Sequence, residues 1–334
     1  MDSEIGSERS FLQNIRHLIQ KPVGAVLGFD DDASDLPIVP KTSVVVNVDT
    51  FVRETDWLPG MTAAQVGYKT AVMAVSDIVA KGAAPQGLML SLCFPQDYSR
   101  EEATEIVRGY SQYGLKNGIP FLGGDLGCAE DVVLTGVAIG TASPSRIISR
   151  GGTKKGDIIA TTGLFGLTAV AYEHLIRGQE LDSGLREAAL VAAYKPQIYH
   201  HFVAALAESE AVTASMDSSD GLGITLHTMA EQCELAFVID RLPIPPDVLR
   251  FAEENNLDEM RLVMGGGEEF ILVVTIPDEK WDMALDIAKK QRVPLREIGR
   301  AQKGEGVVYE SSEGVIEVPR LGYDSLTRWD SSSE

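Results

Sequence analysis

The sequence has few cysteines and no long apolar run. Its three cysteines, Cys93, Cys128 and Cys233, lack the CxxC spacing of a thiolate zinc site and do not suggest a disulfide framework. We expect them to be buried free thiols. No stretch approaches the roughly 20 apolar residues that cross a bilayer, and the acidic start MDSEIGSERS lacks the basic region and apolar run of a secretory signal. These absences predict a cytoplasmic protein.

Basic residues are also scarce. The 29 lysines and arginines face 49 aspartates and glutamates, which gives a formal net charge of −20. Nucleic acid and anionic membranes both need basic surface, so we expect neither as a partner. The apolar content of 44% and the charged content of 23% are ordinary for a folded soluble chain and argue against disorder.

Several familiar phosphate and metal motifs are missing. The sequence has no GxxxxGK[ST] P-loop, no GxGxxG that opens a helix after a strand, and no HExxH. DDDASD is not an EF-hand loop, because its sixth position lacks glycine and Lys41 stands where the bidentate glutamate belongs. We expect the histidines to be structural or at the surface. The turn Gly163–Gly166 precedes a helix whose N-terminus could accept a phosphate, although a tight turn explains it equally well.

Helix-like and strand-like segments alternate along the whole chain, which predicts α/β and α+β architecture. The length favours two domains, and the Gly- and Lys-rich stretch 145–156 is the best boundary, so we expect domains over 1–148 and 149–334. Helices are expected over 7–20, 62–82, 99–118, 167–178, 220–232 and 278–290. Strands are expected over 43–51, 87–94, 119–124, 132–140, 157–163, 211–217, 235–240 and 270–277.

Acidic residues recur where the surrounding chain looks buried or turns tightly. Asp49 ends the Val-rich segment VVVNVDTF, and Asp77 shares one side of an apolar helix with Lys69. A buried carboxylate without a partner costs several kcal/mol, and Mg²⁺ is a cation that takes carboxylate and water oxygens. Each acid alone is more simply a cap, a turn residue or a solvated group. Together they predict several Mg²⁺ ions that hold a polyphosphate such as ATP.

Seven motifs follow one another in a fixed order: GFDDDASDL, NVDTFV, YKTAVMAVSDIVAKGAAP, FLGGDLG, SRGGTKKGDIIATTG, MDSSDGL and GGGEEFILVV. In this order they resemble the thiamine-monophosphate kinases, a family within the aminoimidazole ribonucleotide synthetase superfamily. The resemblance runs from about residue 24 to about residue 326. The set is highly specific for the superfamily and moderately specific for the kinases.

The resemblance implies a two-domain fold and a phosphotransferase. The sheet of the N-terminal α/β domain would pair with that of a second subunit into a barrel, so a homodimer is expected, and the C-terminal α+β domain would complete the ATP cleft. The γ-phosphoryl group of ATP would pass directly to thiamine monophosphate, giving thiamine diphosphate and ADP. No dedicated catalytic base is expected, because a phosphate oxygen is already an anionic nucleophile near pH 7.

The resemblance also assigns site residues by position. The implied Mg²⁺ ligands are Asp32, Asn47, Asp49, Asp77, Asp125, Asp217 and Asp220. The implied ATP contacts are Gly124, Asp125, Arg150 and Ser219. On the acceptor side the implied residues are Glu268, near the thiamine end, and Asp56, which stands where the family commonly has a histidine.

The chain departs from the family pattern at several positions. The usual GDD is DDD, which leaves open whether Asp31 or Asp32 is the ligand, GGDT has become GGDL with Leu126, and GGEDYEL has become GGEEFIL with Phe270. The metal and ATP positions are kept while the acceptor positions differ. Two alternatives therefore remain: another ATP-dependent synthetase of the superfamily with a different acceptor, and a catalytically silent nucleotide- or metal-binding protein.

Overall fold

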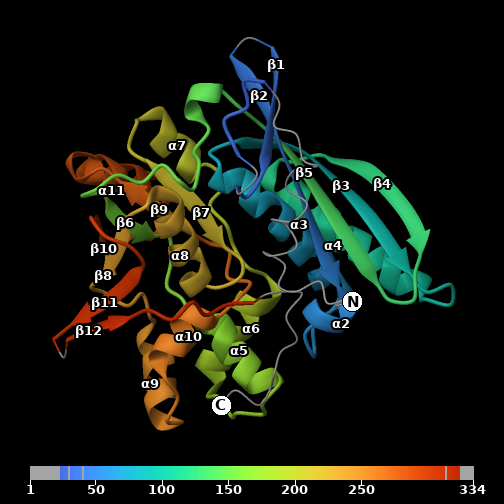
Figure 1. Cartoon of the computed structure of the whole chain (residues 1–334). Helices are drawn as coiled ribbons and strands as arrows, with labels where there is room; N and C mark the ends of the chain where they lie inside the picture. The colour runs from blue at the N-terminus through green and yellow to red at the C-terminus, as the bar shows by residue number, and fades with distance from the viewer. Residues whose placement is uncertain (1–22, 29–30, 40, 313, 324–334) are drawn as a thin grey trace, which may run out of the picture.

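Two sheets, each flanked by helices, organise the chain (Figure 1). The structure is a computed structural model that describes residues 23–28, 31–39, 41–312 and 314–323, so the helix expected over 7–20 lies outside it. The first sheet has five strands in the order β1-β2-β5-β3-β4, and the second has seven in the order β12-β11-β8-β10-β6-β9-β7. The chain passes from the first sheet to the second between the end of β5 at Ala142 and the start of β6 at Ile158.

The first half contains the strands β1 (Ser34–Val39), β2 (Thr42–Val52), β3 (Ala84–Phe94), β4 (Phe121–Cys128) and β5 (Val133–Ala142) and the helices α2 (Arg53–Asp56), α3 (Ala63–Ala80) and α4 (Arg100–Asn117), followed by the 3-10 turn η2 (Pro144–Arg146). The second half contains the strands β6 (Ile158–Thr161), β7 (Ala214–Ser218), β8 (Ala236–Ile239), β9 (Ile271–Ile276), β10 (Arg296–Gln302), β11 (Val307–Ser311) and β12 (Gly314–Glu317). Its helices are α5 (Leu167–Leu175), α6 (Ser183–Tyr194), α7 (Phe202–Glu208), α8 (Leu222–Cys233), α9 (Pro246–Glu254), α10 (Glu259–Gly265) and α11 (Trp281–Gln291), with the 3-10 turn η3 (Asp278–Lys280) before α11.

Every helix and strand predicted within the described residues is present, with its ends shifted by a few residues. Sequence reasoning did not foresee β1, α2, α6, α7, α9, α10, β10, β11 and β12. The expectation of three buried thiols is wrong: Cys93 and Cys233 are only partly buried, and Cys128, at the end of the edge strand β4, is exposed.

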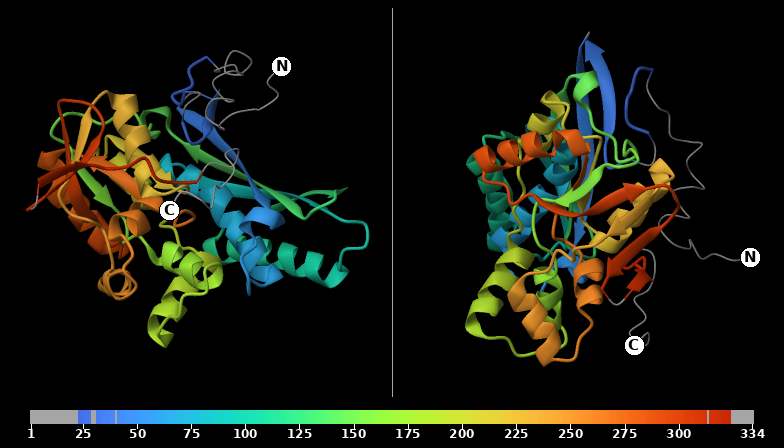
Figure 2. Two further views of the ribbon diagram at one scale, coloured as in Figure 1. Left: turned by 60° about the horizontal axis from the view of Figure 1, so that its bottom comes forward. Right: turned by 90° about the vertical axis from the view of Figure 1, so that its left-hand side faces the viewer.

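Helix α3 is the central element of the fold. Its start is fixed by a capping box between Thr62 and Gln65, and most of its residues are buried. It packs on the first sheet and on α4, and it also contacts β7 of the second sheet (Figures 1 and 2). The crossing with α4 is close: a Cβ atom on Gly67 would lie 1.8 Å from the carbonyl oxygen of Ile106, and one on Gly109 would lie 1.8 Å from that of Ala64. Glycine is therefore required on both helices.

The face of the first sheet that turns away from α3 and α4 carries several exposed apolar side chains. Side chains alternate between the two faces of a strand, and Val48, Met89 and Leu122 on this open face are 59%, 39% and 58% exposed. The opposite face of β2 carries Asn47 and Asp49, which are turned toward α3. This alternation places polar ligand-type side chains against a buried helix.

Candidate active site

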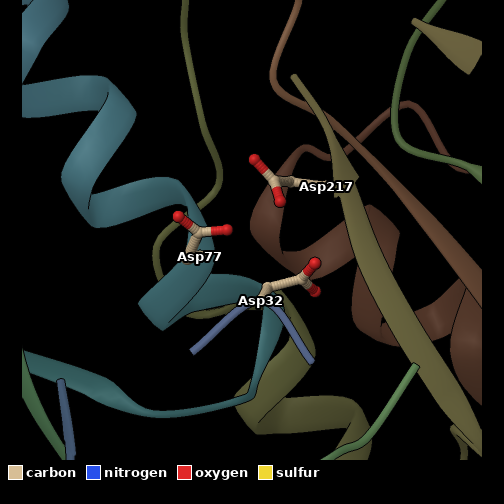
Figure 3. A group of neighbouring side chains, drawn as sticks. All are labelled: Asp32, Asp77 and Asp217. Atoms are coloured by element: carbon tan, nitrogen blue, oxygen red, sulfur yellow. The ribbon is translucent and has the colours of Figure 1, made fainter. Parts of the chain in front are cut away.

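Three aspartates from distant parts of the chain meet between α3, β7 and the segment that precedes β1 (Figure 3). Asp32 precedes β1, Asp77 lies in the last turn of α3, and Asp217 lies in β7. One carboxylate oxygen from each lies within 4.8 Å of the other two. We refer to Asp32, Asp77 and Asp217 as the three-aspartate group.

Short hydrogen bonds hold two members of this group in place. The hydroxyl of Ser76 in α3 donates to Oδ2 of Asp217 at 2.6 Å, which ties the helix to β7. The Nδ2 amide of Asn47 donates to the carbonyl oxygen of Ala74 at 3.3 Å and to the Asp77 carboxylate. The predicted ligands Asn47 and Asp77 therefore lie in direct contact.

Burial and mutual repulsion raise the pKa values of these acids. Burial is the largest cause for Asp77, and the negative charges of Asp217 and Asp32 raise its pKa further. The pKa of Asp217 is raised mainly by burial and then by Asp32. Asp49 on β2 has its pKa raised to about 7, first by burial and then by the nearby charge of Asp217. Carboxylates that raise one another's pKa values are stabilised as anions by a cation, and oxygen ligands of this kind suit Mg²⁺. The donor set therefore fits Mg²⁺.

Asp31 and Asp32 have different surroundings. Asp31 accepts from the Lys81 ammonium and the Ser149 hydroxyl, both at 2.8 Å. Although burial opposes it, the charges of Lys81 and Arg150 hold the pKa of Asp31 below its usual range. Asp32 faces the other acids, and its carboxylate also pairs with Lys81 at 2.6 Å and with Arg150. The structure thus brings Asp32, rather than Asp31, into the group. It also shows that lysine and arginine compensate part of the acidity, whereas the sequence suggested mainly metal.

The predicted ATP contacts fall in two places. Arg150 lies beside Asp32, and Ser219 follows β7 directly, where its carbonyl oxygen accepts from the Glu268 amide at 2.5 Å. Asp220 is the next residue, and its carbonyl oxygen accepts from the amide of Tyr323. Arg150 thus contacts the group directly through Asp32, whereas Ser219 and Asp220 follow Asp217 by two and three residues along the chain.

Gly124 and Asp125 lie apart, on the edge strand β4. Asp125 pairs with Ser91 of β3, which pairs with Thr135 of β5, which in turn pairs with Thr50 of β2. Side chains at paired positions share a face, so Asp125 lies on the open face, opposite to Asp49. A Cβ atom on Gly124 would lie 1.7 Å from the Leu90 carbonyl oxygen, so close strand contact already requires glycine there. Within one chain, neither residue joins the group.

The predicted acceptor residues Asp56 and Glu268 lie close enough to Asp49 for their charges to add to the rise in its pKa that burial causes. The Asp56 carboxylate accepts from the Val52 amide at 2.7 Å, and its pKa is raised by burial and, among nearby charges, by Glu268. Glu268 accepts from the Tyr172 hydroxyl at 2.5 Å and pairs with the Lys69 ammonium, also at 2.5 Å. Sequence reasoning assigned no role to Tyr172, because a tyrosine in an amphipathic helix carries no distinguishing pattern.

Tyr323 is a second residue near the acceptor side that the sequence did not reveal. Its pKa is raised by burial and then by the charge of Asp56, with Glu268 contributing as well. Its side chain is 41% exposed. It comes from the end of the described chain, where only folding could bring it beside residue 56.

The turn at Gly163–Gly166 does not offer a free helix end. The Glu269 carboxylate accepts from the amides of Gly166 at 2.8 Å and Thr168 at 3.4 Å, so it caps α5 from another part of the chain. Burial raises the pKa of Glu269 to about 8. This arrangement favours the structural explanation of the turn over a phosphate site.

Comparison with known proteins supports the motif-based resemblance. The N-terminal domain model of the AIR synthase related proteins matches residues 30–142, and the C-terminal domain model matches 154–310. The chain is 33% identical over 283 residues to the thiamine-monophosphate kinase of Nitrosopumilus maritimus, which covers 85% of this chain and 89% of the relative. The three-aspartate group draws on both matched regions.

Two solved structures share the fold over nearly the whole chain. The structure of AaThiL complexed with AMPPCP and TMP superimposes with a TM-score of 0.83 at 22% identity, covering 97% of this chain and 99% of that one. The structure of tt0281 from Thermus thermophilus gives a TM-score of 0.81 at 29% identity, covering 95% and 99%. In the part of the chain that the structure describes, no helix is long and apolar enough to span a membrane.

Proposed function

Because the chain belongs to the thiamine-monophosphate kinases of the AIR synthase related family, we propose that it transfers the γ-phosphoryl group of ATP to thiamine monophosphate. The observation that carries the proposal is the three-aspartate group, which both family domains build together. The acceptor candidates Asp56 and Glu268 lie near Asp49, whose pKa is raised by burial and then by the charge of Asp217, a member of the group, and by their own charges. This proximity supports an acceptor site next to the metal site.

The chain's own residues are suited to orientation rather than to proton transfer. An oxygen of the acceptor phosphate forms a bond to the γ-phosphorus while the bond from that phosphorus to the β,γ-bridging oxygen breaks, so ADP leaves with the electron pair. The nucleophile is already anionic, and no side chain needs to take a proton from it. Asp56 and Glu268 would orient the acceptor, whose thiazolium ring is cationic. Arg150 and Ser219 would contact ATP.

Mg²⁺ is the cation that the acids fit best. Asp32, Asp77 and Asp217 would hold it, with Asn47 and Asp49 completing the oxygen-rich surroundings. When bound, such ions neutralise the charge that develops on a transferring phosphoryl group. Asp220 and Asp125 remain proposed Mg²⁺ ligands. Asp125 would bind metal on the open face of the first sheet, apart from the three-aspartate group.

We also propose that the open face of the first sheet pairs with a second subunit into a barrel. An exposed apolar sheet face is an interaction surface far more often than a free one. Val48, Met89 and Leu122 all lie on it. We propose domains over 1–148 and 149–334, and a cytoplasmic location, since a kinase needs the ATP of that compartment.

Two alternative functions are considered beside the kinase. Another ATP-dependent synthetase of the superfamily would keep the metal and ATP residues and change the acceptor, which the departures at Asp56, Leu126 and Phe270 would permit. A silent binding protein is disfavoured, because acids that raise one another's pKa values destabilise a fold that has no use for them.

A coupled ADP-release assay tests the proposal. Purified protein is supplied with ATP and Mg²⁺ and with thiamine monophosphate, thiamine or a ribonucleotide amide. ADP release with thiamine monophosphate alone is the expected result. Release with the amide would point to the synthetase, and no release with any acceptor would favour the silent protein.

A further inference from the structure

Glu268 has a backbone conformation that most residues avoid. Its φ is 61°, in the left-handed region, although it is not glycine, and Phe270 two residues later has a φ of 51°. The amides of both residues donate to the strand end that carries Asp217, through the carbonyl oxygens of Ser219 and Ser218. Such conformations persist where surrounding contacts enforce them, and they gather at binding sites. The backbone therefore fixes the direction in which the Glu268 side chain leaves the chain.

Side chains from both domains contact the Glu268 carboxylate. Oε1 lies 2.5 Å from Nζ of Lys69, in the middle of α3. Oε2 accepts at 2.5 Å from the hydroxyl of Tyr172, in α5 of the second domain. The Glu268 side chain remains 23% exposed while that of Lys69 is 0% exposed. Each carboxylate oxygen has a second lone pair, so the group can still accept from a bound molecule.

Lys69 is an unexpected residue for its position. Its neighbours on the helix, Val66, Thr70, Val72 and Met73, are buried, and an apolar side chain would pack there without a charge to desolvate. Among the described residues, Glu268 is the one carboxylate that forms an ion pair with it. Its ammonium has no hydrogen bond of good geometry to any described group, so its contact with Glu268 is an ion pair. A buried charge of this kind is better explained by the orientation it imposes on its partner than by stability.

We infer that Lys69 and Tyr172 are positioning residues that lock the Glu268 carboxylate in one orientation across the domain boundary, so that it can bind the cationic part of the acceptor. This inference rests on the proposed function. Lys69 supplies the opposite charge and Tyr172 fixes the second oxygen, so the carboxylate neither rotates nor turns toward the acids of the three-aspartate group. Neither residue is placed against ATP.

Tyr172→Phe provides the mildest test, because it removes one hydroxyl from a buried ring. The KM for thiamine monophosphate should rise about tenfold, the effect of one hydrogen bond to a charged group, while the KM for ATP changes less than about twofold. Tyr110→Phe is the matched control: its hydroxyl donates to the Met89 carbonyl oxygen at 2.7 Å and not to Glu268. This control should leave both KM values unchanged.

A double-mutant cycle shows whether Tyr172 acts through Glu268. In a Glu268→Ala background the added Tyr172→Phe change should have almost no effect on the acceptor KM, because the group it positions is gone. Lys69→Met should also raise the KM for thiamine monophosphate, and Lys69→Arg should raise it less because the positive charge is kept. If Lys69→Met does not fold, the tyrosine cycle still decides the matter.

Additive effects in the cycle, or equal changes in the KM values for both substrates, would overturn the inference. The wild-type protein is measured first. If it releases no ADP with thiamine monophosphate, the proposed function fails. If it is active and Tyr172→Phe behaves like Tyr110→Phe, the function stands and the positioning role fails.

Discussion

The Lys81 ammonium lies between two consecutive aspartates, 2.8 Å from Asp31 and 2.6 Å from Asp32, and has no exposed surface. It also donates to the carbonyl oxygen of Ser215 in β7 at 2.7 Å. Burial lowers the pKa of Lys81, but the two aspartates outweigh this effect and the pKa is raised. One buried cation thus ties α3 to the segment before β1 and to the second sheet.

Lys81→Met should destabilise the protein by about 3–5 kcal/mol, because it leaves two carboxylates buried with one cation fewer. Urea unfolding followed by circular dichroism measures the change. Lys155→Met, at an exposed lysine, is the control and should stay within about 0.5 kcal/mol of the wild type. A Lys81 variant as stable as this control would show that the ion pairs of Lys81 with Asp31 and Asp32 contribute nothing to stability.

Asp77→Asn should abolish most of the activity while the fold survives. We expect kcat to fall by about a hundredfold or more, since a metal ligand is lost. The thermal midpoint without metal should stay equal or rise, because the substitution relieves repulsion from Asp217 and Asp32. Asp97→Asn, at an exposed aspartate, should change neither quantity. Wild-type turnover in the Asp77 variant would remove this residue from the metal site.

Without divalent ions, stability should fall as pH rises from about 4 to about 7. The folded pKa of Asp49 is about 7, above the value of about 4 in an unfolded chain, so the folded state binds more protons across this window. This stabilisation is complete below about pH 4 and is lost as pH rises through the folded pKa. Glu269, whose folded pKa is about 8, changes stability with pH in the same direction.

The measurement is the melting temperature between pH 5 and pH 8, in EDTA and in excess Mg²⁺. In EDTA it should fall with pH, and Mg²⁺ should remove the fall because it stabilises the carboxylates as anions. Asp49→Asn should show a smaller fall in EDTA. A melting temperature that rises with pH in EDTA would contradict the electrostatic description of the site.

Val48→Asp should convert a dimer into a monomer. Val48 lies on β2 and is 59% exposed on the open face, so the charge costs little in one chain but would be buried in a barrel. Light scattering after gel filtration gives the mass. Val191→Asp, at a valine on α6 that is 51% exposed, is the control and should leave the mass unchanged. Equal masses for both variants would place the interface elsewhere.

Local patterns in the sequence predicted the local structure well. The helix start at residue 62, the Val-rich strand β2 and the one-sided spacing of Lys69 and Asp77 in α3 were all predictable, because they depend on neighbours within a few residues. The partners of these side chains were not. Lys81 meets Asp31 from 50 residues away, and Lys69 meets a glutamate in the other domain.

The placement of Asp125 shows a second limit. A shift of register between Leu88 and Met89 interrupts the pairing of β3 with β4, and a one-residue shift moves a side chain to the other face of a sheet. Period-two reasoning cannot foresee such a bulge. The motif suggested that Asp125 joins the other acids, whereas within one chain it lies across the sheet from Asp49.

The central claim is that the acids hold nucleotide through Mg²⁺ rather than through basic side chains. Calorimetric titration of the folded protein with the non-hydrolysable analogue AMPPCP, in Mg²⁺ and in EDTA, tests it most directly. We predict binding in Mg²⁺ that is lost in EDTA and strongly weakened by Asp77→Asn. Equal affinity in both solutions, or no binding in Mg²⁺, would contradict the account.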